Sequence, residues 1–190
     1  SEVYNETGVI ENVKNEGAIS VTDSSQAKTG GIVGNNAGQV SKAENTGAVT
    51  GTWHVGGILG YSNNSKNTAV INSELHNSGT VTGIGAFSYV GGIVGQVFQG
   101  KFDDLSNGGT VTVNAGGIIG HNSSTNSSGS FTNLSNSGAI TGNVTNAGYA
   151  GGIFGENDAA LEFEKFNNSG TIKGNGWIGG NIGYNNGGAI

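Results

Sequence analysis

The sequence contains no cysteine, no proline and no methionine among its 190 residues, and only 11% of the residues are charged. Without cysteine the chain has no disulfide framework and lacks the ligands of most structural zinc sites. Seven basic residues against 13 acidic ones argue against nucleic acid or an anionic membrane as a partner, because both require a basic patch. No stretch approaches the roughly 18 consecutive apolar residues of a membrane-spanning helix, so we expect no direct membrane insertion.

Glycine is abundant, with 38 residues, and many of them belong to a five-residue phrase that recurs along the chain. Five copies read Gly-Gly-Ile-apolar-Gly, and the sixth is degraded at its third position. The copies span residues 30–34, 56–60, 91–95, 116–120, 151–155 and 179–183. Self-similarity of this kind is the signature of a repeat protein.

A second phrase alternates with the first and reads apolar-x-x-apolar-x-Asn-x-Gly-x-apolar. Its glycine occupies positions 17, 47, 79, 109, 138 and 170, so that successive steps are 30, 32, 30, 29 and 32 residues. The basic period is therefore near 30 residues. Insertions alternate between two places in the unit, which adds a weaker period of two units.

The phrases predict strands rather than helices, because each glycine costs a helix up to about 1 kcal/mol relative to alanine. Short apolar runs bounded by Asn-Gly and Ser-Gly are typical of strands, and we expect three in each unit. One unit buries too little apolar surface to fold alone, which favours stacking of neighbours. We therefore predict an all-β fold, a right-handed parallel β-helix (β-solenoid) of about six coils. The two-unit period leaves open a propeller-like or prism-like ring of paired units. We expect residues 1–190 to form one domain that is a fragment of a longer array.

The asparagine of the second phrase is predicted to have a structural role. Asparagine tolerates left-handed turn geometry, and its amide can bond to equivalent amides in the coils above and below. The predicted asparagine ladder consists of Asn15, Asn45, Asn77, Asn107, Asn136 and Asn168.

The Gly-Gly-Ile-Val-Gly phrase, followed by Asn-x-Gly-x-Val, resembles the GLUG motif, which is named for Gly-Leu-any-Gly. This motif recurs in large bacterial surface proteins, including adhesin-like proteins and the non-catalytic repeat regions of immunoglobulin A peptidases. The resemblance covers essentially the whole chain, although isoleucine replaces the leucine of the name and Asn181 stands there in the last copy. It implies an extracellular or bacterial cell-surface protein with a β-helical repeat region and no activity for this segment. The peptidases' His-Glu-x-x-His motif is absent.

The sequence favours no catalytic, cofactor or metal site. Its three histidines, His54, His76 and His121, fall at non-equivalent positions of different units. The acidic pairs Asp103–Asp104 and Glu156/Asp158 are interpreted as solvated turns, and the Gly-Gly-x-Gly-x-Asp calcium repeat is missing. We therefore expect a protein that is not an enzyme.

Two columns of side chains are predicted to face outward. The first lies two residues before each Gly-Gly pair and provides the candidate ligand-binding residues His54, Tyr89, Tyr149 and Trp177, together with the adjacent Trp53. Exposed aromatic rings can stack on sugars or become buried in a protein interface, although they can also simply shield a strand edge. The second column is the row Ser20, Thr50, Thr82, Thr112, Thr141 and Lys173. Regular threonine rows suit an ice-binding surface, and they suit an ordinary strand as well.

These observations favour a non-catalytic stalk or adhesive module of a bacterial surface protein, with a host protein or a glycan as its partner. The alternative is a carbohydrate-binding or polysaccharide-degrading β-helix. That alternative expects Asp103, Asp104 or other acidic residues to lie in one groove beside Tyr89, Tyr149 or Trp177. Ice binding is the less favoured third hypothesis.

Overall fold

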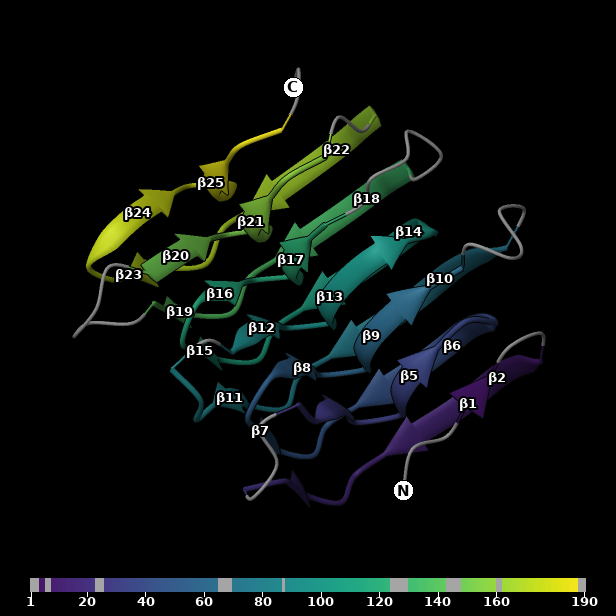
Figure 1. Ribbon diagram of the computed structural model, residues 1–190. Helices are drawn as coiled ribbons and strands as arrows, with labels where there is room; N and C mark the ends of the chain where they lie inside the picture. The colour runs from purple at the N-terminus through teal and green to yellow at the C-terminus, as the bar shows by residue number, and fades with distance from the viewer. Residues whose placement is uncertain are drawn as a thin grey trace.

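A computed structural model describes residues 4–5, 8–22, 26–64, 70–86, 88–123, 130–142, 148–159 and 162–187. All regular secondary structure among these residues is β-strand. The strands form four parallel sheets, called here sheets A to D, and each sheet takes one strand from every coil (Figure 1).

The coils share one order of strands, which is sheet B, then C, then D, then A. Sheet A contains β1 (Tyr4–Asn5), β5 (Val33–Asn36), β9 (Leu59–Asn63), β13 (Val94–Gln99), β17 (Ile119–Asn122), β21 (Phe154–Asn157) and β25 (Ile182–Asn185). Sheet B contains β2 (Val9–Asn15), β6 (Gln39–Asn45), β10 (Ile71–Asn77), β14 (Lys101–Asn107), β18 (Ser130–Asn136) and β22 (Glu162–Asn168). Sheet C contains β3 (Ile19–Ser20), β7 (Val49–Gly51), β11 (Val81–Gly83), β15 (Val111–Thr112), β19 (Ile140–Thr141) and β23 (Ile172–Lys173). Sheet D contains β4 (Lys28–Gly30), β8 (His54–Gly56), β12 (Tyr89–Gly91), β16 (Ala115–Gly116), β20 (Gly148–Gly151) and β24 (Gly176–Gly179).

The predicted all-β solenoid is confirmed. Sheet B runs continuously from β2 to β22, and its six strands define five full turns of about 30 residues, with β1 and β23 to β25 adding partial turns. The alternative of a propeller-like or prism-like ring of paired units is wrong, because every sheet runs along the whole stack instead of closing within a pair of units. Parallel neighbours satisfy one another's backbone groups, which is how coils that cannot fold alone become stable together.

Each coil has four strands rather than the three predicted, because the Gly-Gly phrase is a corner with a strand on both sides. Sheet D ends at the first glycine of the pair, and sheet A starts two residues after the second. At Gly31, a Cβ atom would overlap the carbonyl oxygen of Gly57 in the next coil. At Gly34, inside β5, it would lie 2.8 Å from the carbonyl oxygen of Lys28. Gly34 therefore lets strands of sheets D and A approach each other closely, and Gly31 lets the corners of successive coils do so.

Sheet B explains why two apolar positions in the second phrase are three residues apart instead of two. The second of the two residues between these positions has a positive φ of 49° to 59° in every coil. The strand pairing passes over this residue. The residues concerned are Asn12, Lys42, Glu74, Asp104, Asn133 and Lys165. Because this left-handed residue interrupts the alternation, Ile10 and Val13 both point into the core.

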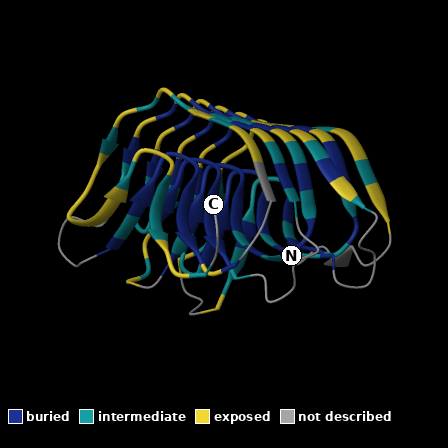
Figure 2. Cartoon of the chain, turned by 90° about the horizontal axis from the view of Figure 1, so that it is seen from above, coloured by how far each residue is buried: buried dark blue, intermediate teal, exposed yellow. Residues whose placement is uncertain are grey.

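The interior is divided into two hydrophobic cores. Figure 2 shows the buried residues on the inside of the coils. The larger core lies between sheets A and B, and its phenylalanines include Phe102 and Phe131, whose parallel rings have centroids 5.5 Å apart. The smaller core lies between sheets C and D and consists of valine, isoleucine and alanine, such as Val81 and Val90. Sheets C and D pack closely, because a Cβ atom at Gly51 of sheet C would lie 3.0 Å from Val55 Cγ2 of sheet D, so small side chains fill the space between them.

The asparagine column lies at the end of sheet B and reaches across to the Gly-Gly corner. Each Nδ2 atom donates to the Oδ1 atom of the next asparagine over 2.7 to 2.9 Å, from Asn15 through to Asn168. The same Nδ2 atoms donate to the carbonyl oxygen two residues further along the chain. The side chain of Asn45 meets Gly31 of the corner, so the column separates the two cores. Asn122, Asn157 and Asn185 form a second, shorter column in sheet A, which sequence analysis missed.

Candidate functional site: the face shared by sheets A and D

The predicted aromatic column lies on sheet D. His54 pairs in register with Lys28 on one side and with Tyr89 on the other, and Tyr149 pairs with Trp177 two coils further on. Parallel register places equivalent residues about 4.8 Å apart, which is close enough for successive rings to touch. Trp177 is 50% exposed, whereas the other rings are half-buried and His54 is buried.

A second column, which sequence analysis did not find, runs beside it on sheet A. It contains the residue that directly follows the last glycine of each phrase, and its members pair in register. The members are Asn35, Tyr61, Gln96, His121, Glu156 and Tyr184. The sequence offered a signal for this column, because each member lies at the same offset from a Gly-Gly pair and every member is polar or aromatic. We call the two columns, together with Trp53 and Asp158, the aromatic stripe.

Five side chains make a cluster in the first half of the stripe. The His54 ring stacks on Tyr61 and Tyr89, with centroids 5.7 and 6.0 Å away, and contacts Trp53 at 5.5 Å. The Lys28 ammonium group lies 4.4 Å from the centroid of the Tyr61 ring, within the range of a cation–π interaction. A cationic side chain and four rings from adjacent coils therefore form one surface.

Three aromatic residues form a second cluster in the last part of the stripe. The Tyr149 ring lies 5.4 Å from Trp177 and 5.1 Å from Tyr184, and the latter two are 5.5 Å apart. These centroid distances are typical of favourable aromatic pairs. Since Trp177 remains half exposed, the cluster presents an aromatic surface to solvent.

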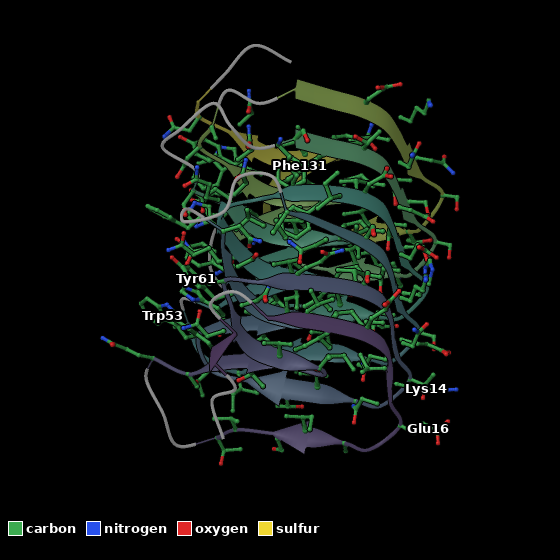
Figure 3. The ribbon with its side chains drawn as sticks, turned by 90° about the vertical axis from the view of Figure 1, so that its right-hand side faces the viewer. Lys14, Glu16, Trp53, Tyr61 and Phe131 are labelled. Atoms are coloured by element: carbon green, nitrogen blue, oxygen red, sulfur yellow. The ribbon has the colours of Figure 1, made fainter. Side chains whose placement is uncertain are left out.

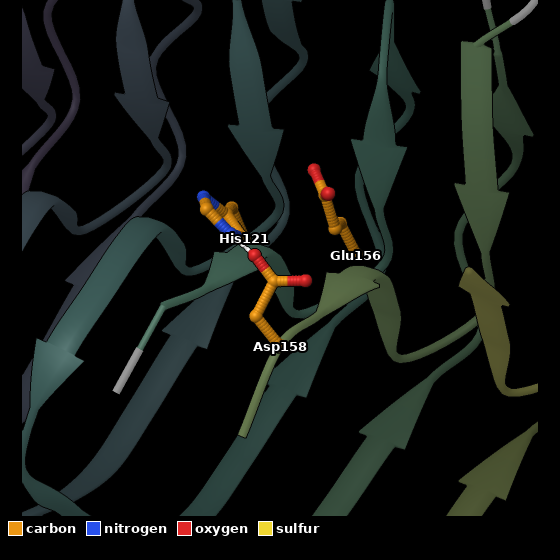
Figure 4. Close-up of side chains that lie close together, drawn as sticks. All are labelled: His121, Glu156 and Asp158. Atoms are coloured by element: carbon orange, nitrogen blue, oxygen red, sulfur yellow. Dashed lines mark hydrogen bonds and ion pairs between the residues drawn. The ribbon is translucent and has the colours of Figure 1, made fainter. Parts of the chain in front are cut away.

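Between the two clusters lies a group of ionisable side chains (Figure 4). His121 Nε2 is 3.0 Å from Asp158 Oδ2, and Gln96 Nε2 lies 3.2 Å from His121 Nδ1. The His121 ring also contacts Tyr89, with centroids 4.3 Å apart. Glu156 is 8% exposed and lies on β21, so the interpretation of Glu156 as part of a solvated turn is wrong, while Asp158 just beyond the strand is exposed.

Burial shifts the protonation equilibria of both histidines in the stripe. It lowers the pKa of His54 to about 3, and the neighbouring Lys28 and His121 act in the same direction. Burial also lowers the pKa of His121, although the hydrogen bond to Asp158 opposes that shift. Both imidazole rings are therefore neutral at physiological pH.

The acidic and phenolic groups shift in the opposite direction. Burial and the nearby Asp158 carboxylate raise the pKa of Glu156 to about 7. Burial, followed by the charge of Glu156, raises the pKa of Tyr89 to about 12 and also raises that of Tyr149. A carboxyl group with a strongly shifted pKa beside aromatic rings marks this part of the surface as a functional candidate.

The other surfaces noted in the sequence lie elsewhere. Trp53 and Tyr61 occupy the opposite side of the solenoid from Lys14 and Glu16 (Figure 3). Asp103 lies on β14 in sheet B, where it accepts a hydrogen bond from Asn133, so Asp103 and Asp104 do not join the aromatic rings. The acidic residues that do so are Glu156 and Asp158.

Two further polar surfaces contain no aromatic cluster among the described residues. The threonine row of sheet C pairs in register from Ser20 to Lys173, but strands such as β11 are only two or three residues long. A shallow concavity of about 440 Å³ follows the turns between sheets B and C and is lined by His76, Ser106, Ser135 and neighbouring residues. Neither surface brings buried ionisable side chains together in the way that the stripe does with His121 and Glu156.

The fold and this site define a β-solenoid repeat protein with an aromatic and acidic surface stripe. No protein-family model and no curated protein sequence matches the chain. Among solved structures, it is similar to a protein from Bacteroides ovatus described as a putative immunoglobulin A1 protease, with a TM-score of 0.65 and 21% sequence identity. The match covers 90% of this chain and 61% of the Bacteroides ovatus chain, and it supports the solenoid fold. Among the described residues no helix could span a membrane.

Proposed function

We propose that this chain is a non-catalytic ligand-binding segment of a bacterial cell-surface or secreted protein, and that the aromatic stripe is its binding surface. The observation that carries the proposal is the pair of ring clusters on one face, of which Trp177 is half exposed. Solenoid coils present equivalent positions as continuous columns, so a stripe can contact an extended ligand over several coils. The GLUG resemblance and the likeness to the Bacteroides ovatus protein support the surface assignment.

The favoured ligand is a glycan chain. Aromatic rings supply flat apolar surfaces for stacking, while Gln96 and Asp158 lie between the ring clusters and offer hydrogen-bonding groups for hydroxyls. The formal net charge of -6 favours neutral or basic ligands over anionic ones. A host protein that buries the same rings is the second kind of partner, and the test below distinguishes the two.

A binding screen on a glycan array and a panel of host proteins tests this function. Trp177→Ala and Trp53→Ala should each weaken binding about ten-fold, the equivalent of about 1.4 kcal/mol of ring contact. His76→Ala is the matched control, because His76 lies on the surface between sheets B and C, away from the stripe. The proposal is contradicted if no ligand binds, or if binding survives both tryptophan changes. Binding to proteins alone would reject the glycan and retain the surface.

The surface location has its own test. Antibodies against this segment should label intact cells of the source organism or detect the protein in the culture medium. Labelling only after cell lysis would contradict the surface assignment while leaving the ligand-binding proposal untouched.

A polysaccharide-degrading β-helix is the second candidate, favoured by Glu156. Its pKa of about 7 and the neighbouring Asp158 are the arrangement expected of a general acid beside a carboxylate. Release of reducing ends or unsaturated products from a bound polysaccharide, abolished by Glu156→Gln, would establish this activity. Binding without product release would support the non-catalytic function.

A further inference from the structure

Three metal-binding side chains come together at the centre of the aromatic stripe, from two successive coils. His121 on β17 and Glu156 on β21 are directly paired neighbours in sheet A, and Asp158 follows one residue after β21 ends. One nitrogen or oxygen atom from each side chain lies within 4.8 Å of the others (Figure 4). The parallel register that stacks the coils therefore also assembles this group.

The arrangement leaves one buried oxygen atom without compensation. Glu156 is 8% exposed, and its Oε2 atom is inaccessible to solvent and has no hydrogen-bond partner among the described residues. Leaving a buried acceptor unsatisfied costs about 1–3 kcal/mol, and more when the group is charged. Asp158 cannot supply a donor when ionised, and His121 Nε2 already faces Asp158. A cation between the three side chains would satisfy this oxygen.

The side-chain amide of Gln96 lies at the ring nitrogen of His121 that faces away from Asp158, which is where a metal-bound histidine usually has its outer partner. The His121 Nδ1 atom lies 3.2 Å from the side-chain amide of Gln96, which also contacts Ser123 Oγ at 2.8 Å. With a cation on Nε2, the ring proton would sit on Nδ1, and the Gln96 amide would turn its oxygen toward that proton. Such an outer contact fixes the tautomer and the orientation of a ligating ring.

We propose that His121, Glu156 and Asp158 bind a divalent transition-metal ion of the zinc class. Imidazole is a ligand that zinc accepts readily, whereas magnesium and calcium prefer sites built from oxygen alone. Three protein ligands leave the fourth position of a tetrahedral ion open. Zinc–ligand bonds of about 2.1 Å separate ligand atoms by roughly 3.4 Å. His121 Nε2 and Asp158 Oδ2 are already 3.0 Å apart, so only the distances to Glu156 have to shorten, by up to about 1.4 Å.

This site goes beyond the proposed glycan or protein binding, which requires no metal. The ion would sit between the two ring clusters, next to Tyr89 and Tyr149, whose hydroxyl groups feel the charge of Glu156. Its open position would face the surface on which a ligand lies. In the first half of the stripe, the Lys28 side chain supplies a positive charge. In the centre, two carboxyl groups lie beside His121, whose neutral ring supplies none.

The test measures metal binding alone, so its outcome is independent of any glycan or protein ligand. The chelator-stripped chain is titrated with zinc chloride near neutral pH in a calorimeter, and a cobalt titration is followed by its visible absorption. One equivalent should bind, and zinc should raise the thermal unfolding midpoint while magnesium does not.

Variants locate the ion. His121→Ala and Asp158→Asn should each lower the affinity by at least ten-fold, and Gln96→Leu should lower it by about ten-fold through loss of the outer contact. His76→Ala, which removes a surface histidine outside the group, should bind like the unmodified chain. Circular dichroism verifies that each variant is folded, and Asp158→Asn is the change least able to disturb folding because that residue is exposed. Absence of binding to the unmodified chain, or binding that His121→Ala and Asp158→Asn leave intact, overturns the proposal.

Discussion

Replacing Asn107 with alanine should destabilise the solenoid more than any exposed polar substitution. Its Oδ1 atom accepts from Asn77 Nδ2 at 2.8 Å and from the Gly109 amide at 3.2 Å. Its Nδ2 atom donates to the Gly109 carbonyl at 2.8 Å and to Asn136 Oδ1 at 2.9 Å. The residue is 1% exposed, so water cannot replace these partners. The alanine variant breaks the column in the middle of the stack.

The magnitude follows from the groups left behind. At least two buried groups lose a partner, at about 1–3 kcal/mol each, which gives a loss of about 4 kcal/mol in the free energy of unfolding. For a chain of this size, that loss lowers the unfolding midpoint by about 8–16 °C. Asn107→Asp should be at least as damaging at neutral pH, because the second carboxylate oxygen would face two acceptors, the Gly109 carbonyl and Asn136 Oδ1.

The assay is urea unfolding followed by circular dichroism and by tryptophan fluorescence. Trp53 and Trp177 lie on opposite sides of the substituted coil, so single-tryptophan versions report whether the two halves still unfold together. Asn167→Ala is the matched control, since Asn167 neighbours the last asparagine of the column but is exposed. If Asn107→Ala falls within about 0.5 kcal/mol of that control, the range of ordinary surface changes, the column is not the stabilising element inferred here.

Three further outcomes are expected. Gly92→Ala should cost about 3 kcal/mol or more in urea unfolding, because its Cβ would overlap the carbonyl oxygen of the next coil's corner glycine, whereas Gly108→Ala, with its nearest contact at 3.7 Å, should be tolerated. His54 should make stability fall as the pH drops from 6.5 toward 3, because its pKa is about 3 in the folded state and the unfolded chain binds the proton more readily, whereas Glu156, whose pKa is raised to about 7, acts in the opposite direction between pH 7 and 4.5. His54→Gln should flatten that part of the pH profile, and an unchanged slope would contradict the assignment. Glu74→Gly should raise the free energy of unfolding by about 0.5 kcal/mol by relieving a φ of 53°, whereas Asn133→Gly should gain less because asparagine tolerates this geometry; equal effects would contradict the argument.

Strand register within each sheet could be predicted from the repeat alone. When coils stack in parallel, each residue pairs with its equivalent one period later, so aligning the phrases aligns the strands. Asn15 pairs with Asn45, and Gly30 pairs with Gly56, as their places in the two phrases require. The variable insertions fall between strands and leave this pairing intact, except that the register of β13 with β9 shifts between Val97 and Gln99.

Local patterns were less informative about the shape of the coil. The spacing of Ile10 and Val13 predicted a strand but not the left-handed residue between them. The strand that follows the Gly-Gly phrase, such as β5, was missed because glycine and asparagine are poor strand formers. That strand is held in place by pairing with its equivalents above and below.

The sequence by itself determined the period, the stacked columns and the aromatic column on sheet D, because these depend only on equivalent positions recurring. Only the tertiary structure decided which columns lie side by side. The corner between sheets D and A sets that relation, and it brings Tyr89 against His121 and Tyr149 against Tyr184, each from the following coil. Insertions of unequal length hide such contacts between sheets from any repeat alignment. The group of His121, Glu156 and Asp158 therefore became visible only once the chain was folded.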